Sequence, residues 1–180
     1  MAITRLGPNQ SVNLASNVTG TLPAANVANS TLNNVTALPA AITTGKVLQV
    51  VSVVADVETA STSSSYADIT EMTASITPSS ASNKVFVSVQ LANCSKTSGD
   101  TQLDLKLLRD SSAISLVGGL NDGSSTAQTS LGGIINFLDS PSSTSSLTYK
   151  VQLSNRDGNG TVTVQGNNKD GSITLMEIAG

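Results

Sequence analysis

The sequence predicts an all-β protein, an antiparallel jelly-roll sandwich preceded by an extended N-terminal arm and assembled as a trimer. Short segments with alternating apolar and polar residues recur from residue 45 onward, with turn residues between them. No segment shows the spacing of an amphipathic helix. Residues 1–44 differ in composition and contain a short internal repeat. We therefore divide the 180 residues into an arm, 1–44, and a head domain, 45–180.

The head is expected to contain about nine or ten short strands. Alternation is clearest at 84–91, where Val85, Val87, Val89 and Leu91 share one face. The other expected strands span 47–54, 66–69, 72–76, 103–107, 112–117, 131–138, 147–153, 161–165 and 173–178. The segment 47–54 is partly apolar on both faces. This many short strands, with turn signals between them, favours a jelly roll.

The arm contains a near-repeat, because the phrase at 17–25 recurs one residue shorter at 34–41. Pro23 and Pro39 argue against a continuous helix. An arm of this composition cannot offset its ordering entropy alone, so it is either a disordered tail or ordered by winding with other copies. We expect the second, because its apolar residues are regularly spaced. The candidate trimer and anchor contacts are Val18, Leu22, Val27, Leu32, Val35, Leu38 and Ile42.

Composition argues against most enzyme and nucleic-acid functions. The chain has no histidine, which excludes Ser-His-Asp triads and histidine zinc sites. The net charge of −3, without a basic cluster, argues against a nucleic-acid partner. No apolar run is long enough for membrane insertion. We therefore expect no catalytic residues, no cofactor and no metal, and interpret Cys94 as a buried apolar side chain rather than a reactive thiol.

Polar loops are the remaining candidate sites. The segments 121–124 and 157–160 offer Asp and Asn oxygens for a cation such as calcium, but they lack the distal Glu of a calcium loop and fit tight turns. Acidic residues between 56 and 71 are too dispersed to predict a glycosidase pair. The loop 118–130 is either a solvated connection or a recognition surface. Its candidate recognition residues are Asn121, Asp122, Ser124 and Thr126.

Six short sequence segments occur in an informative order: 14–25, 45–51, 75–80, the paired segments 138–141 and 147–151, and 173–178. In this order the chain resembles bacteriophage virion appendages, especially tail fibres with short shaft repeats. The resemblance implies a jelly-roll head similar to the tumour-necrosis-factor and C1q type, assembled as a homotrimer, with no catalytic residues.

The function implied is that of a virion structural protein assembled in the host cytoplasm. Its arm would attach to other virion proteins of the tail or capsid, and its head would contact a glycan or protein of the host surface. The alternative is a capsid decoration or cement protein, a trimer that stabilises the head shell. The short chain, without a long adaptor segment before the repeat, leaves both attachment points open.

Overall fold

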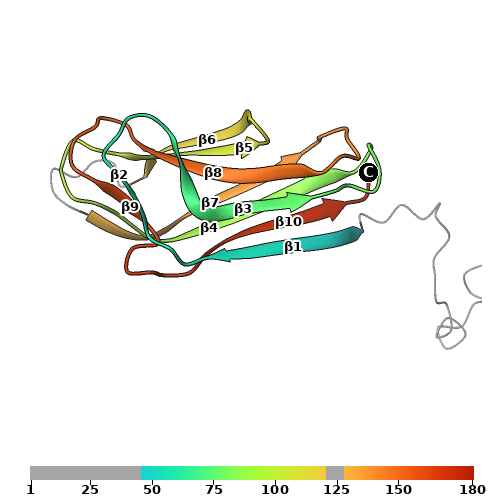
Figure 1. The fold of residues 1–180 in the computed structure, drawn as a ribbon, viewed down its shortest axis with the longest axis horizontal. Coiled ribbons are helices and arrows are strands. Elements are labelled where there is room, and N and C mark those ends of the chain that lie inside the picture. Colours follow the sequence, from blue (N-terminus) through green and yellow to red (C-terminus); the bar gives the residue numbers. More distant parts are fainter. Residues whose placement is uncertain (1–45, 121–127) are drawn as a thin grey trace, which may run out of the picture. The chain divides into compact units, whose positions relative to one another are not determined.

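The computed structural model describes residues 46–120 and 128–180, and its regular structure in these residues is entirely β. In this part of the chain no helix is long and apolar enough to cross a membrane. The strands form two antiparallel sheets packed as a sandwich (Figure 1). The all-β prediction for the head is therefore confirmed.

One sheet has the order β1-β10-β4-β7 along its long strands. These strands are β1 (Val47–Ala55), β10 (Gly171–Ile178), β4 (Lys84–Lys96) and β7 (Gln128–Asp139). Two short strands, β9 (Val162–Val164) and β2 (Thr59–Ser61), extend this sheet from one end of β4.

The other sheet has the order β3-β8-β5-β6. Its strands are β3 (Ala67–Ile76), β8 (Leu147–Asn155), β5 (Leu103–Arg109) and β6 (Ser112–Leu120). The chain passes repeatedly from one sheet to the other, so that strands adjacent in a sheet are mostly distant in sequence. Eight long strands in these two orders make a jelly roll.

Side chains that alternate inward from both sheets form the core. Val85, Val87, Val89 and Leu91 of β4 are at most 1% exposed, as expected from their spacing. The alternating apolar residues of β5, β8 and β10 are also buried. Tyr149 is among the largest fully buried side chains, and Cys94 is buried as predicted.

The structure corrects several of the expected element boundaries. The expected strands at 66–69 and 72–76 form the single strand β3, with a register shift between Asp68 and Thr73 and Glu71 at a φ of 62°. The expected loop 118–130 is shorter, because β6 continues to Leu120 and β7 begins at Gln128. Residues 128–130 are polar and show no apolar alternation. They form part of β7 because they pair with β4. The short strand β2 was not predicted at all.

Candidate interaction surface

An apolar row crosses the outward side of the β1-β10-β4-β7 sheet. Val50 pairs with Met176, Met176 with Phe86, and Phe86 with Leu138. Residues paired in register lie on the same side of a sheet, and the neighbours of these four along each strand point into the core. Val50 is 55% exposed and Leu138 is 51% exposed, while Phe86 and Met176 are half-buried. The row therefore joins four strands that are far apart in the sequence.

Further apolar residues lie on the same side, where Val47 pairs with Ile178 and Ile134 is paired with Gln90. We call this outward surface the apolar face, and define it by Val47, Val50, Val54, Phe86, Ile134, Leu138, Met176 and Ile178. Exposed apolar residues scattered singly are ordinary, whereas a set gathered across one sheet marks an interaction surface.

Charge is nearly missing from the apolar face. In the described residues of its four strands, Lys84 is the only charged side chain at an outward position. A polar row lies beside the apolar one, where the hydroxyls of Ser52 and Thr174 are hydrogen-bonded over 2.8 Å. Uncharged polar groups with apolar neighbours are typical of the centre of a protein interface, which is depleted of charged residues.

The outward side of the other sheet is different. Lys150 pairs with Asp68 over 2.8 Å, and Gln152 also donates to Asp68, over 2.7 Å. These hydrogen bonds, that of Lys150 first, lower the pKa of Asp68. The ammonium of Lys106 lies 3.7 Å from the centre of the Tyr66 ring. Ion-paired side chains of this kind belong to a water-exposed surface.

A hollow of about 180 Å³ opens on the apolar face, between β4 and β7. It is lined by Gln90, Leu91, Gly132 and Ile134. A Cβ atom at Gly132 would collide with the carbonyl oxygen of Leu91, so glycine permits the close approach of the two strands. Ile134 stands at the rim and is 65% exposed. A projecting side chain and a recess therefore lie next to each other.

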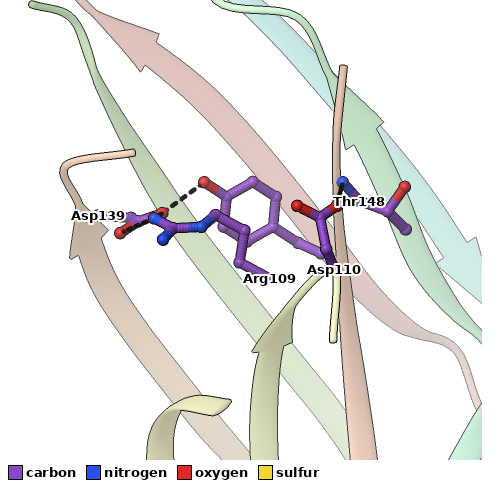
Figure 2. A network of polar contacts seen from close by, with 5 residues as sticks. Arg109, Asp110, Asp139 and Thr148 are labelled. Atoms are coloured by element: carbon purple, nitrogen blue, oxygen red, sulfur yellow. Dashed lines mark hydrogen bonds and ion pairs between the residues drawn. The ribbon is translucent and has the colours of Figure 1, made fainter. Parts of the chain in front are cut away.

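Buried polar groups tie the two sheets together at Asp139, which is 7% exposed (Figure 2). Arg109 of β5 donates to both carboxylate oxygens of Asp139, at 2.9 and 2.7 Å, and the hydroxyl of Tyr149 donates at 2.7 Å. The hydrogen bond to Asp139 raises the pKa of Arg109, and burial raises the pKa of Tyr149. Asp110 beside this cluster accepts a hydrogen bond from the backbone of Thr148. The carboxylate of Asp139 is thus engaged in linking strands.

A second buried carboxylate, Glu177 of β10, is 1% exposed. It accepts hydrogen bonds from Gln49 at 2.6 Å, from the backbone amide of Ser79 at 2.7 Å and from Asn83. Burial favours a higher pKa for Glu177, but these hydrogen bonds outweigh it and lower the pKa to about 2. This cluster fastens β1 and the turn before β4 to the last strand.

The sites predicted from sequence fall mostly outside the described residues. This holds for the candidate contacts of the arm and for Asn121, Asp122, Ser124 and Thr126. The segment 157–160 lies in the connection between β8 and β9, with Gly158 and Gly160 at positive φ. Asn155 donates to the carbonyl oxygens of Asn159 and Gly160, so this segment has the geometry of a turn.

Acidic residues near the β1–β3 connection have separate neighbours. Asp68 pairs with Lys150, and Glu58 accepts a hydrogen bond from the backbone amide of Asn167. The described residues contain no group of three or more His, Cys, Asp or Glu that could hold a metal ion.

Sequence reasoning did not find the apolar face. The one signal was that 47–54 is apolar on both sides, which is unnecessary in a strand with a single buried face. The other members, Phe86, Met176 and Leu138, occupy outward positions in otherwise ordinary alternations. Only the register of the four strands shows that they form one row.

No known protein family matches the sequence, and no curated protein does. Among solved structures, the infectious bursal disease virus VP2 subviral particle matches with a TM-score of 0.36 and 14% sequence identity. The alignment covers 73% of this chain and 38% of the VP2 chain. The chain thus spans well under half the length of that viral protein, and a TM-score of this size carries no statement about function.

Proposed function

We propose that this chain is a non-enzymatic structural protein of a bacteriophage virion, a homotrimeric fibre. The arm, 1–44, attaches it to other virion proteins, and the head contacts a glycan or protein on the host surface. The order of shaft-like and head-like phrases in the sequence supports the assignment to a phage. The structural observation that carries the proposal is the contrast between the nearly uncharged apolar face and the ion-paired opposite face, because it suits a subunit that works in an assembly.

A structural role also agrees with how the described charged groups are used. Asp139 and Glu177 are buried and engaged by several donors that link strands. Asp104 pairs with Arg156 over 2.7 Å near the start of β5. These carboxylates support the sandwich, and we propose no catalytic role for them.

The second candidate is a capsid decoration protein, whose trimer would cap the head shell. Antibodies to the purified protein, used in immunogold electron microscopy of virions, separate the two candidates. Label on the tail at few copies supports the fibre, and dense label over the capsid supports decoration. Virions that carry no label would contradict both.

Deletion of residues 1–44 tests the role of the arm. The remaining head should fold, with a β-type circular dichroism spectrum, and should be missing from virions. If the shortened protein is incorporated as well as the full chain, the arm is not the anchor.

A further inference from the structure

We infer that the apolar face is the surface through which copies of this chain contact one another in the trimer. The inference rests on the proposed function, which supplies the homotrimer, and it assigns the contact to one face of the sandwich. Its centre is the row Val50–Met176–Phe86–Leu138, which crosses all four long strands of the β1-β10-β4-β7 sheet.

The charge distribution favours another copy as the occupant. A partner recognised by charge would need complementary charges on this face, and Lys84 is its only outward charged side chain in the described strands. Two or three copies of an almost uncharged surface come together without repulsion between like charges. The opposite sheet, with Asp68, Lys150 and Lys106 on its outward side, lacks this property.

The shape of the face points the same way. Ile134 projects with 65% of its surface exposed, and the hollow over Gly132 opens beside it. One surface therefore carries both a projecting side chain and a recess of about 180 Å³. A neighbouring copy can supply the side chain that fills the recess, and burial of the exposed isoleucine removes its apolar surface from water, which favours association.

The size of the face is sufficient for a stable contact. Four strands about 4.8 Å apart and about eight residues long cover roughly 500 Å² in projection. A typical specific interface buries about 800 Å² of accessible surface on each partner, and accessible surface exceeds the projected area. The apolar face thus supplies most of such an interface.

The test uses the full chain and a matched pair of substitutions. Leu138→Lys places a charge in the apolar row, and Leu116→Lys places one at a leucine of β6 that is 67% exposed and paired with Lys106 on the other sheet. We expect Leu138→Lys to weaken trimer association at least about tenfold in sedimentation equilibrium. Leu116→Lys should associate like the unsubstituted protein.

A milder pair covers the case in which Leu138→Lys fails to fold. Met176→Cys and Thr148→Cys place a thiol on a central strand of each sheet, and the natural Cys94 is fully buried. A short bifunctional maleimide should cross-link Met176→Cys chains into covalent dimers, because each chain offers one accessible thiol, and leave Thr148→Cys chains single.

The outcomes separate this inference from the proposed function. An unsubstituted protein that stays monomeric would overturn the homotrimer itself, and with it the inference. A trimer that withstands Leu138→Lys and does not cross-link through Met176→Cys would overturn the inference alone, because the copies then meet elsewhere.

Discussion

Tyr149 of β8 donates its hydroxyl hydrogen to Asp139 of β7 over 2.7 Å, and so joins the two sheets of the sandwich. Arg109 of β5 completes the cluster with a bidentate ion pair to the same carboxylate. A buried carboxylate is costly unless charged and polar donors surround it, and here three donor contacts do so. The chain has no tryptophan and few aromatic residues, so this polar link supplements a core built mainly of aliphatic side chains.

Replacement of Asp139 by Asn should destabilise the head by about 2 kcal/mol, because Arg109 and Tyr149 lose a charged acceptor that is almost fully buried. Urea denaturation measures the change. Asp68→Asn is the matched control, since its ion pair with Lys150 is exposed and should contribute less than about 1 kcal/mol. Equal losses of stability in the two variants would show that the buried Asp139 cluster contributes no more than an exposed ion pair.

Glu177 should make the head acid-sensitive. Its pKa falls on folding from its ordinary 4.5 to about 2 because hydrogen bonds from Asn83, Gln49 and Ser79 outweigh the effect of burial. A lowered pKa in the folded state adds stability above pH 4.5 that is lost as the pH falls toward 2. The free energy of unfolding, measured by urea at several pH values, should decline over this window.

Glu177→Gln is the control for this pH dependence. The variant should be less stable at neutral pH, because it loses the charged acceptor, and its stability should change less between pH 4.5 and pH 2. The same steep decline in the variant would assign the acid sensitivity to other carboxylates.

Alternation allowed much of the head to be predicted. Inward residues such as Val87, Leu105 and Val151 repeat every second position in strands with one buried face, and a period of two identifies such strands directly. The bulge at Glu71 could not be predicted, because its positive φ depends on how β3 pairs with β8.

Surface features that depend on how distant strands pair could not be predicted from the sequence. Met176 and Phe86 are separated by 90 positions in the chain, and nothing local marks them as neighbours. The same applies to the buried cluster, although Asp139 and Tyr149 fall in two of the phrases that carried the family resemblance. Period-two patterns identify which residues point out of a sheet, and only the strand order shows which of them share a surface.

Cys94 should be unreactive in the folded protein. Burial raises the pKa of its thiol to about 11 and outweighs a hydrogen bond from the Gly133 backbone, which by itself would lower the pKa. The thiolate is the reactive form of cysteine. Ellman's reagent at pH 8 should release almost no chromophore from the native chain and one equivalent after denaturation. Rapid labelling without denaturant would contradict the burial of this side chain.

Gly132→Ala should destabilise the head by about 1–3 kcal/mol, because the added methyl group meets the carbonyl oxygen of Leu91 on the paired strand. Thermal unfolding followed by circular dichroism measures the loss. Ser88→Ala, at an outward position of β4, is the control and should change stability by less than about 0.5 kcal/mol. Unchanged stability in Gly132→Ala would mean that β4 and β7 lie farther apart.

Sedimentation equilibrium of the full chain tests most directly the claim that this protein is an assembling structural subunit. We predict a single species at three times the 18.2 kDa mass of the chain. A stable monomer at all concentrations would contradict the account, because the apolar face would then remain exposed to water.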